Sequence, residues 1–170
     1  DPRVKRLVLW WGKMLTPRDP RPQGQQGATP NRRYSPAMGR DCIGGPGGTC
    51  GAMARVSQPF DADYSADLQW AWREEGASGW FGHLGGFSYV SSDKHLPAKT
   101  PDWTSEVFPC AGAVFRHGLG TANEHQVMLY SGDHFAAFYP GHTGSFPGIF
   151  AYGVPVAGSF AGSYEYQERY

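Results

Sequence analysis

The sequence has few cysteines, no long apolar run and little charge. Its three cysteines are an odd number, which argues against a dedicated disulfide scaffold. One bridge beside a free thiol stays open, and three thiols in a reducing compartment fit at least as well. No run approaches the roughly 18 apolar residues of a membrane span, so we expect no transmembrane segment. The start, DPRVKRLVLWWGKML, lacks the small-residue cleavage site of a signal peptide. The cysteines, read as free thiols, suit an intracellular or organellar complex.

The backbone is rich in the residues that interrupt regular structure. The chain has 24 glycines and 14 prolines among 170 residues, so long helices are not expected. Aromatic residues make up 15% of the chain, and their large side chains compensate for a modest aliphatic content. We therefore predict a mainly β fold with one or two short helices, with an α+β arrangement as the alternative.

The net charge of zero conceals a strong asymmetry along the chain. Residues 1–40 hold nine basic and two acidic residues, or +7, whereas residues 41–170 hold six basic and thirteen acidic residues, or −7. A sign asymmetry of this kind is typical of a chain with a partner surface. We expect residues 1–40 to form a basic helix plus an extended anchoring arm, and residues 41–170 to form one compact domain.

Residues 2–15 are predicted to form an amphipathic helix. Asp1 can cap its first amides, Pro2 suits the first helical position, and Thr16-Pro17 ends it. Trp10 and Trp11 are adjacent, so they lie about 100° apart around the helix axis. The wide apolar face that results suits contact on more than one side. The apolar residues at helical spacing are Val4, Leu7, Val8, Trp11 and Leu15.

Residues 16–40, TPRDPRPQGQQGATPNRRYSPAMGR, form a polar, basic segment rich in proline and glycine. This composition cannot bury enough apolar area to order itself, so we expect it to lie along another surface. Other protein subunits are the expected partners, with RNA or anionic lipid as alternatives, because arginine binds carboxylate and phosphate alike. The acidic body of the same chain competes with them as the partner of these arginines. We call residues 1–40 the leader. Its expected partner-binding residues are Arg18, Arg21, Arg32, Arg33, Tyr34 and Arg40, together with Trp10 and Trp11.

The body combines one further helix with several strands. Residues 63–75 suit a helix that Asp63 or Ser65 caps and Gly76 ends. Residues 94–109 are expected to be a loop and residues 107–115 a strand. A hairpin is expected from Gln126–Tyr130 and His134–Tyr139, around a turn at residues 131–133. The last stretch is expected to be irregular strand or coil packed through aromatic side chains.

Cys50 is a candidate nucleophile. It follows two glycines and a threonine and can open a short helix, where backbone amides stabilise a thiolate. With His125 at the head of a later strand, the pattern resembles papain-like cysteine peptidases of the bacteriocin-processing type. The resemblance implies a hydrolase in which His125 activates Cys50. The chain departs from the family pattern at Tyr139-Pro140, where an orienting Asp-Pro pair is usual, and at residues 44–48, which lack the upstream Gln.

The cysteines also suggest a metal site. Cys42, Cys50 and Cys110 with any one of His117, His125 or His134 would complete a tetrahedral Cys₃His set. The C-x₇-C spacing is not that of a standard zinc knuckle, and a Cys42–Cys50 disulfide or unlinked buried thiols fit the same residues. The six histidines show no H-x-H or H-E-x-x-H pattern, so most are expected in surface loops.

These features together favour a non-catalytic accessory subunit of a large assembly, which needs no cofactor and is anchored by its basic N-terminal arm. A cysteine hydrolase using Cys50 and His125 is the alternative. An RNA-contacting subunit of a ribonucleoprotein is a further one.

Overall fold

A computed structural model describes residues 1–21, 31–34, 47–77, 90–109, 111–130 and 148–157. The chain divides into two compact units. The helical unit holds the described residues of 1–15, 33–34 and 47–102, and the sheet unit holds those of 16–32 and 103–157. The division into residues 1–40 and 41–170 stays a prediction.

The first helix of the helical unit, α1 (Pro2–Lys13), begins where local chemistry predicts. The Asp1 carboxylate accepts a hydrogen bond from the Arg3 amide at 2.8 Å, and Pro2 occupies the first turn. The side chain of Asp1 thus satisfies one of the amides that a helix start leaves without a partner. The predicted N-terminal helix is confirmed.

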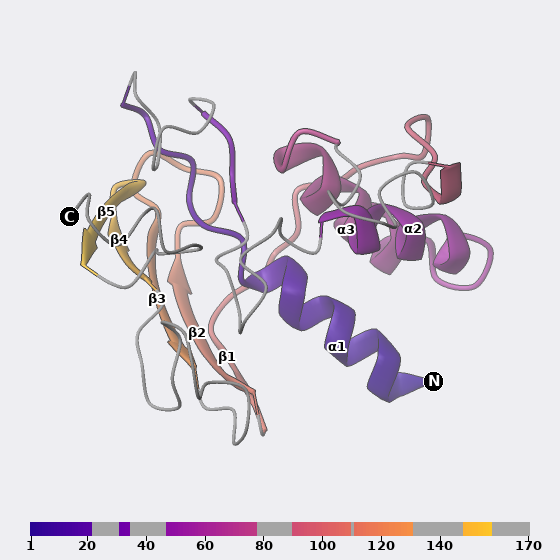
Figure 1. Ribbon diagram of the computed structural model, residues 1–170, viewed down its shortest axis with the longest axis horizontal. Coiled ribbons are helices and arrows are strands. Elements are labelled where there is room, and N and C mark those ends of the chain that lie inside the picture. The colour runs from indigo at the N-terminus through magenta and orange to yellow at the C-terminus, as the bar shows by residue number, and fades with distance from the viewer. Residues whose placement is uncertain (22–30, 35–46, 78–89, 110, 131–147, 158–170) are drawn as a thin grey trace, which may run out of the picture. The chain divides into compact units, whose positions relative to one another are not determined.

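The other two helices pack against each other. They are α2 (Gly47–Ser57) and α3 (Ala62–Glu74), and Figure 1 shows them side by side. Gly51 allows their close approach, because a Cβ there would lie 2.6 Å from Ser92 Oγ and 2.9 Å from the Trp72 ring. The buried apolar side chains of this pair are Cys50, Ala54, Leu68, Ala71 and Trp72.

The cap of α3 differs from the expected one. Asp61 lies at the N-cap and accepts a hydrogen bond from the Tyr64 amide at 3.1 Å, in place of Asp63 or Ser65. The predicted end is confirmed, because Gly76 follows the helix with a φ of 92°, which glycine adopts without strain.

The sheet unit contains a five-stranded antiparallel sheet in which each strand pairs with the next along the chain. The order is β1 (Glu106–Phe108), β2 (Gly112–His117), β3 (His125–Tyr130), β4 (Gly148–Ala151) and β5 (Val154–Ala157), as Figure 1 shows. Together with three short helices, this sheet confirms the predicted fold class, mainly β with short helices.

The predicted strand over residues 107–115 is split into two strands. Phe108 O accepts a hydrogen bond from the Ala111 amide at 3.0 Å, so the chain turns between β1 and β2. Pro109 lies at the second position of this turn, which its fixed φ favours. In the expected hairpin, the first strand is present as β3, whereas residues 134–139 lie outside the described residues. The described part of the C-terminal stretch, residues 148–157, forms β4 and β5 where irregular strand or coil was expected.

The two faces of the sheet differ in burial. On one face Phe108, Val114, Met128 and Phe150 are buried, and Arg116 and Gln126, directly opposite each other, are buried beside them. The other face carries Val107 and Phe115, which are exposed. Within the described part of the chain, no helix is long and apolar enough to cross a membrane.

Candidate functional site

Helix α1 has exposed apolar side chains in its N-terminal half and buried ones in its C-terminal half. The side chains that pack inward are Val8 and Trp10, followed after the helix by Met14 and Leu15, all buried. Val4 is 47% exposed and Leu7 is 51% exposed, while Trp11 is half-buried. Val4, Leu7 and Trp11 follow one another at i, i+3 and i+7, so they share one side of the helix. We call these three residues the α1 stripe.

Two of the cations of α1 are bound to carboxylates of the helical unit. Arg3 forms an ion pair with Asp1, and Lys5 forms one with Asp61. Lys5 also lies 4.7 Å from the centre of the Tyr64 ring, and the Tyr64 hydroxyl donates a hydrogen bond to the Lys5 carbonyl oxygen at 3.0 Å. The hydrogen bonds from the Lys5 ammonium and the Tyr64 amide lower the pKa of Asp61. These contacts fix the start of α1 against the start of α3.

Two of the arginines expected to bind a partner are engaged within the chain. Arg33 is 1% exposed; its Nε donates to Glu74 at 3.0 Å, and its guanidinium carbon lies 5.1 Å from the centre of the Trp70 ring. Arg21 forms hydrogen bonds of 2.6–3.1 Å with the Asp19 carboxylate, which is itself buried. Both guanidinium groups therefore act in the packing of their own units.

The other expected contact residues of the leader differ in exposure. Arg18 is exposed, while Arg32 and Tyr34 are half-buried. Arg40 lies outside the described residues. Of the two tryptophans, Trp10 is buried at 4% exposure and Trp11 is half-buried, so they differ as expected from their angular separation.

Cys50 lies in the fourth position of α2, inside the helical core. It is 2% exposed, and burial together with the negative charge of Glu75 raises the pKa of its thiol far above the ordinary value. A catalytic thiolate requires the opposite shift and access to a substrate. His125, its expected partner, is on β3 in the sheet unit.

The expected metal ligands do not form a group within the described part of the chain. Cys50 is a free thiol there, whereas Cys42 and Cys110 lie outside it. Among the described residues, no three His, Cys, Asp or Glu side chains are placed to hold one metal ion. His117 ends β2 on the surface, directly opposite His125 on β3.

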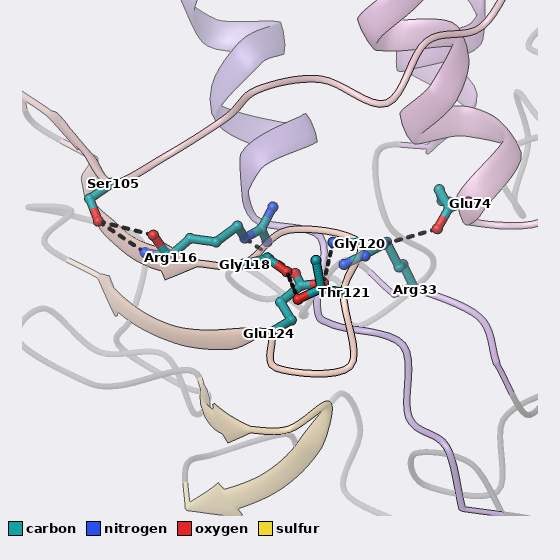
Figure 2. Close-up of polar contacts among 8 residues, drawn as sticks. All are labelled: Arg33, Glu74, Ser105, Arg116, Gly118, Gly120, Thr121 and Glu124. Atoms are coloured by element: carbon teal, nitrogen blue, oxygen red, sulfur yellow. Dashed lines mark hydrogen bonds and ion pairs between the residues drawn. The ribbon is translucent and has the colours of Figure 1, made fainter.

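The turn between β2 and β3 is held by side chains of its own sequence (Figure 2). Glu124 accepts a hydrogen bond from the Gly120 amide at 2.9 Å, and its other carboxylate oxygen lies 3.6 Å from Arg116 Nε. The Thr121 hydroxyl donates to the Gly118 carbonyl oxygen at 2.7 Å. At the far side of β2, Ser105 Oγ accepts from the Arg116 amide at 3.0 Å. Because Glu124 and Arg116 are both buried, their charges balance each other away from water.

This turn brings together three ring side chains that sequence reasoning did not connect. His117 and His125 are directly opposite in the β2–β3 ladder. The Tyr152 ring meets the His125 ring edge-on, with centroids 4.6 Å apart. The register of the two strands was the missing information, since seven residues separate the histidines along the chain.

Comparison with known proteins identifies no relative: no family model, no curated protein and no solved structure matches this chain.

Proposed function

We propose that the protein is a non-catalytic accessory subunit that docks onto another protein through the α1 stripe. The single observation that carries this proposal is the exposure of Val4 and Leu7, two apolar residues in the exposed N-terminal half of a helix whose C-terminal half is largely buried. Apolar residues at i, i+3 and i+7 are the anchors that a helix places into a groove of a partner. In this proposal helix α1 anchors the protein to its partner, and the arm of residues 16–40 extends that contact.

The partner proposed here has an apolar groove edged by carboxylates. Helix α1 and its cap hold four basic residues and one acidic residue, or +3, and Arg3 and Arg6 are exposed on the same helix. A positive rim around an apolar centre favours a partner with the complementary charge. Because such rim charges are screened, salt weakens the association only in part.

RNA and anionic lipid fit this surface less well than a protein does. Both depend on basic groups that neutralise phosphates. On α1, Arg3 and Lys5 are paired with carboxylates and Lys13 is buried. In the segment that follows, Arg33 is buried on Glu74 and Arg21 binds Asp19. The apolar stripe is therefore the stronger feature of the leader.

The test starts from native purification with mass spectrometry, followed by reconstitution with the partner that co-elutes in constant ratio. V4Q/L7Q removes two anchors and keeps good helix formers. We expect this variant to weaken association at least about tenfold, since burying each such side chain contributes about 1.5–3 kcal/mol. V56Q is the matched control, because Val56 is as exposed on α2 but outside the stripe, and it should bind as the unaltered protein does.

Three results would overturn the proposal. The protein could purify as a monomer without a partner, or V4Q/L7Q could bind as well as V56Q. Alternatively, the intact protein could bind poly(U) RNA or vesicles of phosphatidylcholine and phosphatidylglycerol, with a loss of binding at high salt. That third result would support the RNA or lipid alternative in place of a protein groove.

A further inference from the structure

His117 and His125 form a cross-strand pair at the end of the sheet. They are directly opposite in the antiparallel ladder of β2 and β3. Directly opposed side chains point to the same face, with Cβ atoms about 4.5–5.5 Å apart. Their ladder neighbours Arg116 and Gln126 are buried on the other face, whereas His117 is exposed and His125 is half-buried. Both imidazoles therefore lie on the open face of the sheet.

The backbone beneath this pair is well fixed. The connection from β2 to β3 is closed by the Gly120–Glu124 and Thr121–Gly118 hydrogen bonds (Figure 2). The Glu124 carbonyl oxygen accepts a hydrogen bond from the Gly153 amide at 3.3 Å, which ties this connection to the β4–β5 turn. Two histidines on paired strands with a fixed connection hold their separation far better than two histidines on a free loop.

Tyr152 restricts the orientation of His125. It lies in the β4–β5 turn with a φ of 53°, a left-handed conformation that is uncommon for tyrosine. The next residue, Gly153, has a φ of 78°, and a Cβ there would collide with the Arg18 carbonyl oxygen. The close approach of the Arg18 backbone to Gly153 thus holds the β4–β5 turn in place. It sets the Tyr152 ring edge-on to the His125 imidazole at 4.6 Å.

We propose that His117 and His125 together bind a divalent transition-metal ion, with Cu²⁺ bound most tightly and Zn²⁺ and Ni²⁺ less so. Imidazole nitrogens suit these ions, and Cu²⁺ leads the usual affinity order. With metal–nitrogen bonds of about 2.0–2.1 Å, the two ligating nitrogens lie about 2.9 Å apart in neighbouring positions of a square-planar Cu²⁺ site and about 3.3 Å apart in a tetrahedral Zn²⁺ site. Side chains on opposed Cβ atoms can reach both separations. Water completes the coordination, because the described residues supply no third His, Cys, Asp or Glu to the group.

Tyr152 acts in this site as a positioning residue. Its ring contacts the imidazole of His125 and limits the rotation of that ring about its side-chain bonds. Groups that orient a metal ligand contribute about 10- to 100-fold to affinity. The hard ions Ca²⁺ and Mg²⁺ prefer oxygen ligands, so neither should bind here.

The test is a calorimetric titration of the full chain with CuCl₂, ZnCl₂ and CaCl₂. H117Q and H125Q should each weaken Cu²⁺ and Zn²⁺ binding at least about tenfold, since removing a ligand costs no less than removing its outer-shell support. H95Q is the matched control, because His95 is an exposed histidine of the helical unit. The Cu²⁺ electron paramagnetic resonance spectrum should show two coordinating nitrogens in the intact protein and one in each single variant.

Tyr152 is tested by comparing two substitutions. Y152A should weaken Cu²⁺ binding about tenfold, whereas Y152F keeps the ring and should restore it. The site is overturned if H117Q/H125Q binds Cu²⁺ as tightly as H95Q, or if the intact protein shows no two-nitrogen spectrum. Equal loss in Y152A and Y152F would overturn the positioning role alone. Circular dichroism of each variant establishes that the sheet is intact.

Discussion

The helical unit and the sheet unit bury different kinds of side chain. Between α2 and α3 the buried side chains are mostly apolar, with Leu68 and Trp72 at the centre. The buried face of the sheet carries Arg116 and Gln126 beside its apolar residues, with the charge of Glu124 nearby, while Phe115 on the opposite face is exposed. The α2–α3 packing thus depends mainly on the exclusion of water from an apolar core, and the buried face of the sheet depends in addition on balanced charge. The helical unit has its own buried ion pair, Arg33 with Glu74, at the end of α3.

The first prediction that could contradict this comparison concerns whether the helical core excludes solvent from Cys50. Alkylation by N-ethylmaleimide at neutral pH should modify Cys50 at least about a hundredfold more slowly in the folded protein than in urea, because a buried thiol reacts only when the core opens. Peptide mass spectrometry follows this cysteine apart from Cys42 and Cys110. A reaction in the folded protein as fast as in urea, or faster, would contradict the burial and favour the cysteine hydrolase alternative.

A second test concerns the buried charge of the sheet unit. E124A should lower the free energy of unfolding by about 3–5 kcal/mol, because it leaves the charge of Arg116 buried without its carboxylate. Urea unfolding measures the change, and hydrogen exchange of the β2 and β3 amides assigns it to the sheet unit.

The matched control for E124A removes both charges. R116M/E124L should cost less than E124A alone, since replacing a buried ion pair by apolar groups is often close to neutral. A cost for E124A below about 1 kcal/mol, as for an exposed pair, would show that water reaches the pair and that the two units do not differ in this way.

Local patterns predicted those parts of the fold that depend on neighbours in sequence. Asp1-Pro2 marked the start of α1 and Gly76 marked the end of α3, because caps and left-handed glycines act within one turn. The break between β1 and β2 could also have been predicted from the sequence. Pro109 has no amide hydrogen for a strand ladder, and its fixed φ favours a turn.

The candidate site depends on contacts between distant residues. The sequence predicts that Arg33 binds a partner, yet its guanidinium is buried against Glu74, 41 residues later. His117 and His125 could be recognised as a pair only from the register of β2 against β3. Hydrophobic alternation did not fix that register, because the connection between the two strands is polar. Even the exposure of Val4 and Leu7 depended on which part of α1 packs inward, although the width of its apolar face was evident from the sequence.

The smallest effect expected here is at the junction of α1 and α3, where the helical unit does use charge. D61A removes the N-cap of α3 and the partner of Lys5, and should lower the free energy of unfolding by about 1 kcal/mol. D61N is the matched control: asparagine caps a helix about as well as aspartate, so it should lose only the contribution of the Lys5 pair.

The pH dependence separates the charge of Asp61 from its role as a cap. Its pKa is lowered in the folded protein by the hydrogen bonds from Lys5 and the Tyr64 amide. The folded state therefore binds this proton more weakly than the unfolded state, whose aspartate pKa is about 3.9. The stabilisation is complete above that pKa and disappears as the pH falls through the lower, folded value. In urea unfolding, the difference between the unaltered protein and D61N should thus be constant near neutral pH and shrink below about pH 4. If that difference stayed the same down to acid pH, the carboxylate charge would contribute nothing at this junction, and the helical unit would rely on apolar burial there as well.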